Sequence, residues 1–273
     1  MKFENTEVWG FEHAVRGMRN PLNSWDKGDS GYIDRRFNDQ FYIGKNDLDL
    51  AQRLIKAGSE HRKFLRQIFV SVDITAPLYW WKEFDTYKVG TTANSTSTMH
   101  KLASTPITMD CFEMDDYAEL DNGFCTDMWI SLVVWLECLR QKYNETKDKR
   151  YWKELVRLLP ESWLQKRTVT MNYENVLNMY RQRKNHKLSE WSKSFIEWVK
   201  NLPYAEELIR LNFDEEITMT DEEKAEEWVR TNSGYSTKEF HGQKAIEAFL
   251  SGLKAGKDMV YAWKEIEPPK EGE

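Results

Sequence analysis

The chain has 273 residues, of which 40% are hydrophobic, so it can bury one sizeable core and we expect a single domain spanning residues 1–273. Its net charge of −6, with both signs interspersed, argues against binding to nucleic acid or to an anionic membrane. Three cysteines without metal-ligand spacing, and no evident signal peptide, predict a cytoplasmic protein without disulfides and with no metal site. The longest apolar run, residues 129–136, is far shorter than the ~20 residues that span a bilayer.

The first half of the chain predicts a loop, a helix, a strand and a second helix. Residues 20–46 are rich in Gly, Asp and Asn and predict a long loop. A short amphipathic helix is expected over 47–57, capped by Asn46 and ended by Gly58. Residues 68–74 alternate apolar and polar, which predicts a strand, and Thr75-Ala76-Pro77 then supplies a cap and a proline that open a helix over 78–84.

The second half of the chain is dominated by predicted helices. They cover residues 126–143 (apolar and buried), 150–159 (stopped by Pro160), 176–184, 191–199, a charged helix with a capping box at Thr220 and Glu223, and 240–253. A strand is expected at 168–171. The predicted fold class is therefore α/β or α+β, with a central mixed or antiparallel sheet and abundant helices.

Two separated blocks of sequence resemble the flavin-dependent thymidylate synthases (ThyX). Residues 61–67, the strand that follows and Ala76-Pro77 resemble that family's His-x-Ser-Pro-Phe-Glu-His, strand and Ala-Pro without a gap. In the stretch that corresponds to the family signature, residues 86–100, Asn94 and Ser97 match, and Lys88 falls on the last arginine after one inserted residue.

The second block carries the same order of features as the family. Leu159-Pro160, a strand ending at Asn172, a helix with Asn178 and Arg183, and a stretch beginning at His186 correspond in turn. The matched region covers about residues 57–202, and residues 211–273 are expected to form a helical extension.

Several signature positions differ from the family pattern. Thr86 and Tyr87 replace Arg and His, Ser95 replaces Glu, and Met99-His100 replace Arg-Tyr. Glu174 stands where the family has an arginine after the strand-ending asparagine. The contacts to flavin and nucleotide that the family uses are therefore largely rewritten.

The resemblance implies a ThyX-like fold and a flavoenzyme of nucleotide biosynthesis. Its activity would be a methyltransferase reaction that converts dUMP to dTMP, with FAD as cofactor and with NADPH and methylenetetrahydrofolate as co-substrates. It also implies a homotetramer and dUMP, or another pyrimidine nucleotide, as the ligand. The alternative is a catalytically inactive or repurposed relative that acts as a nucleotide-binding or interaction protein.

Arg183 is the residue that the resemblance places at the pyrimidine, both as the catalytic group and as a substrate contact. A guanidinium suits this role because its planar fork donates two hydrogen bonds to a carbonyl or a phosphate. An arginine near a helix end also interacts ordinarily with the last carbonyls of the helix, so both interpretations stay open.

The remaining site residues are predicted with an ordinary structural alternative for each. Ser97 is a candidate substrate contact, and the candidate cofactor contacts are His61, Lys88, Asn94, Asn172, Asn178 and His186. The alternatives are a solvated lysine, a turn-forming asparagine, a polar loop and histidines that make structural hydrogen bonds.

Overall fold

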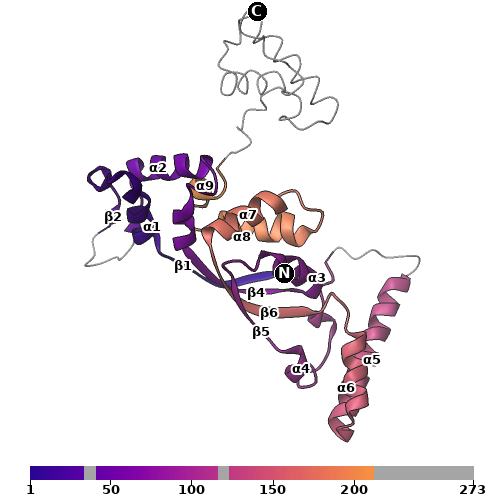
Figure 1. Ribbon diagram of the computed structural model, residues 1–273. Helices are drawn as coiled ribbons and strands as arrows, with labels where there is room; N and C mark the ends of the chain where they lie inside the picture. The colour runs from indigo at the N-terminus through magenta and orange to yellow at the C-terminus, as the bar shows by residue number, and fades with distance from the viewer. Residues whose placement is uncertain (34–40, 116–122, 212–273) are drawn as a thin grey trace, which may run out of the picture. The chain divides into compact units, whose positions relative to one another are not determined.

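The computed structural model describes residues 1–33, 41–115 and 123–211 (Figure 1). The chain divides into two compact units, Met1–Leu211 and Asn212–Glu273. The helices expected around Thr220 and over 240–253 lie outside the described residues. These two helices remain predictions. The single domain with a helical extension also remains a prediction.

A four-stranded antiparallel sheet forms the centre of the first unit. Its spatial order is β1 (Lys2–Trp9), β4 (Phe69–Pro77), β6 (Leu164–Asn172) and β5 (Thr92–Ser95). Each neighbouring pair runs antiparallel. The mixed helix-and-sheet class is therefore confirmed, and the sheet is the antiparallel one of the two predicted kinds.

One face of the sheet is apolar and is covered by helices. The alternation predicted for β4 is observed, because Val70, Val72 and Ile74 are buried while the residues between them are partly exposed. The covering elements are α3 (Leu78–Phe84), α7 (Tyr173–Arg183), a π-helix (Glu190–Phe195) and α8 (Ile196–Lys200). Large rings fill this layer; the ring centroids of Trp80 and Trp191, for example, lie 4.5 Å apart.

The other face of the sheet is polar. Asp73 on β4 accepts hydrogen bonds from the Thr168 hydroxyl at 2.6 Å and from the Asn5 amide at 3.0 Å, and lies 3.3 Å from the Lys166 amine. These partners favour the ionised carboxyl and lower the pKa of Asp73 to about 2.

The long helix α5 (Phe124–Thr146) packs with α6 (Lys149–Leu158) around a second apolar cluster. The fully buried members of this cluster include Leu136 and Leu155. The expectation that the helix is buried was only half right, since Met128, Ile130, Val134 and Trp135 are each about half exposed. The helix has one side in the cluster and an apolar side in solvent.

The N-terminal part contains more regular structure than the sequence predicted. The additional elements are α1 (Phe11–Met18), η1 (Asn20–Leu22), η2 (Trp25–Lys27), β2 (Gly31–Tyr32) and β3 (Phe41–Tyr42). They are followed by α2 (Lys45–Lys56) and η3 (Lys63–Gln67). The short elements that remain are η4 (Asp85–Tyr87), α4 (Thr98–Lys101), η5 (Met109–Cys111) and α9 (Ala205–Leu208).

The ends of two helices differ from the predicted caps. Gly44, not Asn46, is the N-cap of α2, and the carboxylate of Asp29 accepts the N–H groups of Asn46 and Asp47. Thr75 belongs to β4, and the first two N–H groups of α3 instead donate to the carbonyls of Trp163 and Glu161. No helix in the described ranges is both long enough and apolar enough to cross a membrane.

Candidate functional site

The first turn of α7 is fastened to the loop that precedes β5. Asn172 is the N-cap of the helix and forms a capping box with Asn175, whose amide donates to the Val89 carbonyl at 2.7 Å. The next residue, Gly90, has φ of 77°, and a Cβ there would lie 2.9 Å from the Asn172 amide nitrogen. Asn172 is therefore in its structural role, and it brings the loop after Lys88 to the start of α7.

Glu174 lies in the first turn of α7 and holds two arginines. It is 8% exposed; one carboxylate oxygen accepts from Arg62 Nε at 3.1 Å and the other is paired with Arg66. Burial alone raises the pKa of Glu174, but the hydrogen bonds from Arg66 and Arg62 outweigh it, so that pKa is lowered. The carboxylate at the position of the family arginine is thus ionised and neutralises one of two neighbouring cations.

Asn178 joins this group from the next turn of the helix. Its side-chain oxygen accepts from the second guanidinium nitrogen of Arg62 at 3.0 Å, so Arg62 bridges Glu174 and Asn178. Arg62 is buried, whereas the Arg66 side chain is 49% exposed. Arg66 is therefore the cation of this group that faces solvent.

Arg183 lies at the other end of α7 in an ion pair with Glu83 of α3. Its NH1 is 2.8 Å from Glu83 Oε2, and its Nε donates to the Tyr87 hydroxyl at 2.9 Å. The guanidinium carbon lies 5.0 Å from the ring centroid of Trp191, which is within the range of a cation–π contact. These three contacts leave the Arg183 side chain 17% exposed.

His186 also faces Glu83. Its Nε2 lies 3.5 Å from Glu83 Oε2, while its Nδ1 accepts the N–H of Leu188 at 3.2 Å. Because Nδ1 is an acceptor, the ring proton of the neutral imidazole is on Nε2, directed at the carboxylate. The structure therefore brings Arg183 and His186 to a shared anion.

We call this set of residues the α7 cluster. Its members are Arg62, Arg66, Glu83, Tyr87, Glu174, Asn178, Arg183 and His186. Arg62, Arg66, Glu174 and Asn178 form one group at the start of α7, and Glu83, Tyr87, Arg183 and His186 form another at its end. The set holds three arginines and two carboxylates, and Glu60, outside it, also interacts electrostatically with Arg66.

The other predicted site residues lie apart from this cluster or are exposed near it. Asn94 on β5 pairs with Thr168 on β6. Its side chain therefore lies on the polar face of the sheet, away from α7. Ser97 caps α4 and accepts the N–H of His100 at 3.2 Å. Lys88 is exposed beside the α7 N-terminus, and His61 is exposed next to Arg62.

Sequence reasoning missed the partners that decide how Arg183 behaves. Glu83 lies a hundred positions before Arg183, and nothing in a linear sequence marks a contact over that separation. Trp191 lies only eight positions after Arg183, but the sequence does not show that its ring faces the guanidinium. Arg66 and Glu174 were both visible, Glu174 as a departure from the family pattern, but their pairing appears only in the fold. In the described part of the chain, no group of three or more His, Cys, Asp or Glu side chains is arranged to hold a metal ion.

No family model matches the chain, and no curated protein sequence matches it. Solved structures, in contrast, do match the chain. A crystal structure of flavin-dependent thymidylate synthase ThyX from Helicobacter pylori, complexed with FAD and dUMP, matches with a TM-score of 0.55 and 17% sequence identity. The match covers 77% of this chain and 98% of that chain.

A second crystal structure of the Helicobacter pylori enzyme with FAD and dUMP gives the same TM-score of 0.55 and 17% identity, covering 77% of this chain and 97% of the other. The fold is ThyX-like. The resemblance in sequence and the likeness in structure thus point to the same fold.

Proposed function

We propose that the protein binds FAD and dUMP at the α7 cluster and methylates dUMP to dTMP in a ThyX-like reaction. The observation that carries the proposal is the set of arginines along α7, one of them half-exposed, in a fold whose solved examples hold FAD and dUMP. The donors of the cluster fit an anionic, phosphate-bearing ligand, because guanidinium groups bind phosphates through paired hydrogen bonds.

Arg66 and Lys88 are the groups proposed to hold the flavin phosphates. Arg66 keeps about half of its side chain in solvent although it is paired with Glu174, and Lys88 is exposed near the same end of α7. Asn172 is not proposed to contact the flavin. As the N-cap of α7, it would act only by holding the neighbouring loop in place. When bound, the flavin supplies the hydride chemistry, with NADPH and methylenetetrahydrofolate as co-substrates.

Arg183 is proposed to bind and polarise the pyrimidine nucleotide. In the structure its guanidinium is paired with Glu83, so the nucleotide would take over hydrogen bonds that Glu83 now accepts. Tyr87 would keep the guanidinium in place during that exchange, since its contact with Arg183 does not involve Glu83. Trp191 lies against the same guanidinium, and its indole N–H donates to Glu83 Oε2 at 2.9 Å. His186 would present its Nε2 proton to the same anion.

FAD binding tests the first half of the proposal. The purified protein should show the visible absorption of bound flavin after FAD is added, and Arg66→Ala should weaken FAD binding by about tenfold or more because a charge-assisted hydrogen bond is lost. Arg150→Ala is the matched control, since the Arg150 side chain is 89% exposed in a pair remote from α7. Equal loss in both variants would argue against the α7 cluster as the flavin site.

A repurposed, catalytically inactive relative is the second candidate. It is favoured by the two carboxylates that occupy the cationic groups, Glu174 on Arg62 and Arg66, and Glu83 on Arg183. A protein that stays colourless at every FAD concentration would support this candidate and exclude the enzyme.

We also propose that the chain assembles as a homotetramer, as the resemblance implies. The support is the exposed apolar side of α5, where Met128, Ile130, Val134 and Trp135 are 49–57% exposed. Sedimentation equilibrium measures the assembly directly. Trp135→Glu should shift it toward the monomer, whereas Val89→Glu, at an 89% exposed position elsewhere, should not.

A further inference from the structure

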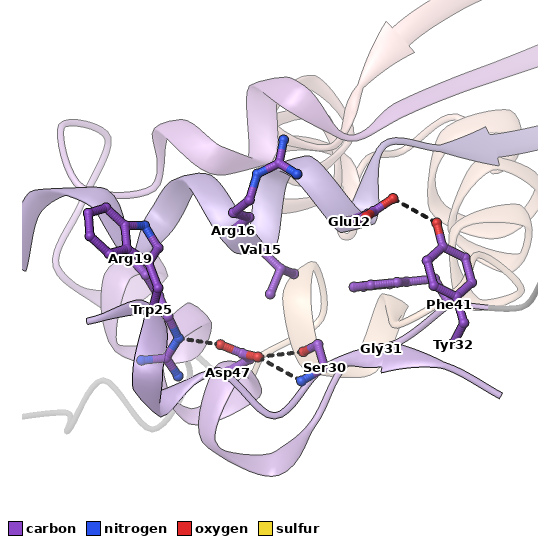
Figure 2. Close-up of a pocket in the computed structure, with 11 residues that line it drawn as sticks. Glu12, Val15, Arg16, Arg19, Trp25, Ser30, Gly31, Tyr32, Phe41 and Asp47 are labelled. Atoms are coloured by element: carbon purple, nitrogen blue, oxygen red, sulfur yellow. Dashed lines mark hydrogen bonds and ion pairs between the residues drawn. The ribbon is translucent and has the colours of Figure 1, made fainter. Parts of the chain in front are cut away.

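A cavity lies in the N-terminal part of the protein, and none of its lining residues belongs to the α7 cluster. It has a volume of about 300 Å³ and is formed by α1, the segment that follows it and the start of α2 (Figure 2). The lining side chains that the argument uses are Glu12, Arg16, Trp25, Tyr32, Phe41 and Asp47. This volume is at the lower end of the range for small-molecule sites and suits a ligand with a single ring.

The wall of the cavity is built around a buried ion pair. Asp47 is 1% exposed; one oxygen accepts from Arg19 Nε at 2.5 Å, and the other accepts from the Ser30 hydroxyl at 2.6 Å and the Ser30 N–H at 3.0 Å. Burial raises the pKa of Asp47, but the hydrogen bonds from Ser30 and Arg19 lower it by more. These contacts fix the segment after α1, which the sequence predicted as a loop, to α2. The segment therefore forms one wall of the cavity.

Aromatic rings lie at the two ends of this cavity. Figure 2 shows Trp25 beside Arg19 at one end and Phe41 with Tyr32 at the other. The Trp25 indole nitrogen donates to Asn20 Oδ1 at 2.9 Å, which fixes a ring that is 53% exposed. The rings of Tyr32 and Phe41 meet edge to face, with centroids 5.3 Å apart. An exposed ring held in one orientation offers a planar ligand a surface on which to stack.

Among the residues that the structure describes, the charges in the cavity leave one cation without a partner. Glu12 and Arg16 are four residues apart on α1, a spacing at which opposite charges on a helix normally pair. Here Glu12 instead accepts a hydrogen bond from the Tyr32 hydroxyl at 2.8 Å. The side chain of Arg16 forms no hydrogen bond or ion pair with the residues that the structure describes, and Asp47 is already neutralised by Arg19.

We propose that this cavity binds a small aromatic acid: one planar ring carrying a carboxylate or phosphate at one end and a hydrogen-bond donor at the other. Arg16 takes the anionic group, the rings take the planar part, and the second oxygen of Glu12 accepts from the donor. Tyr32 is a positioning residue, because its hydroxyl holds Glu12 away from Arg16 and so keeps the guanidinium available for the ligand.

The test uses 3-fluoro-4-hydroxybenzoate as the probe and follows its binding by fluorine NMR. The wild-type protein should bind it saturably, and 2-fluorophenol, which lacks the acid, should bind at least about tenfold more weakly because the charge-assisted hydrogen bond is missing. Arg16→Gln should weaken the acid by a similar factor and leave 2-fluorophenol unchanged. Arg53→Gln is the control, since Arg53 is an exposed arginine on α2 that does not line the cavity.

Tyr32→Phe separates the positioning role from a merely structural one. This variant keeps the ring and the Arg16 cation but releases Glu12 to pair with Arg16. It should weaken the acid, which loses both its cation and the Glu12 acceptor, by more than 2-fluorophenol, which loses only the acceptor. The proposal is overturned if the acid shows no saturable binding at millimolar concentration, or if Arg16→Gln and Arg53→Gln bind it equally well. FAD binding at the α7 cluster is expected to be unchanged in all these variants, so the two proposals fail independently.

Discussion

Two ion pairs that share the same chemistry are expected to contribute very differently to stability. Arg19–Asp47 is buried, with side chains 7% and 2% exposed, whereas Arg53–Asp49 on α2 is 67% and 66% exposed. Removing one partner of a buried pair leaves an uncompensated charge out of water, at a cost of about 3–5 kcal/mol, while an exposed pair contributes at most about 1 kcal/mol.

Arg19→Ala should therefore lower the free energy of unfolding by about 3–5 kcal/mol, and Arg53→Ala by less than about 1 kcal/mol. Urea denaturation of both variants measures the difference. Equal, small effects would show that Asp47 is not buried as described.

Glu137 on α5 gives the stability of the protein a defined pH dependence. Arg140 donates two hydrogen bonds to it and the N–H of Ile107 a third, and mainly through Arg140 its pKa falls from 4.5 to about 2. A carboxyl whose pKa is lowered by folding stabilises the protein above its unfolded pKa and loses that contribution as the pH falls through the folded value.

Glu137→Gln should thus be less stable than the wild type at neutral pH, with the difference disappearing between pH 4.5 and about 2. Thermal unfolding across this range measures it. Glu145→Gln on the same helix, in an exposed pair with Lys142, is the control and should leave the pH profile as it is. A profile unchanged in Glu137→Gln would contradict the assignment.

At the scale of elements, α5 shows how one helix separates into a structural side and a free side. Leu136 is fully buried in the cluster with α6, whereas its neighbour Trp135 is 51% exposed. Leu136→Ala should lower the free energy of unfolding by about 2–5 kcal/mol, through lost burial and the cavity that remains.

Trp135→Ala should have a much smaller effect on unfolding measured under dissociating conditions, although it removes the larger side chain. Chemical denaturation of the two variants at low protein concentration makes the comparison. A larger loss for Trp135→Ala would mean that α5 packs with its other side inward.

The strands show which elements a sequence can predict. β4 was predicted because its period-2 alternation is uninterrupted over the buried face of a central strand. β1 was missed because a register shift between Glu4 and Glu7, with Asn5 at φ of 51°, breaks the alternation. β5 was missed because its four residues, including Asn94, are all exposed at the sheet edge and carry no apolar signal.

The same limit applies to the candidate site. Asn178, Arg183 and His186 were predicted from a resemblance, and the structure places all three on or after α7. Their hydrogen-bond and ion-pair partners were not predicted, because Glu83 and Arg62 come from elements that only the tertiary fold brings to α7.

At the scale of the whole molecule, the central proposal is that this ThyX-like fold binds FAD and dUMP at the α7 cluster. Arg183 and Arg167 provide a matched pair for testing it. Each guanidinium stacks on a tryptophan and pairs with a carboxylate, Arg183 with Glu83 and Arg167 with Asp85, and their side chains are 17% and 15% exposed. Only Arg183 belongs to the α7 cluster.

The most direct measurement is the change in flavin fluorescence when dUMP is added to the FAD-loaded protein. We predict a saturable change in the wild type and in Arg167→Ala, and its loss in Arg183→Ala. A response that survives in Arg183→Ala, or a flavin-loaded wild-type protein that does not respond to dUMP at all, would contradict the account.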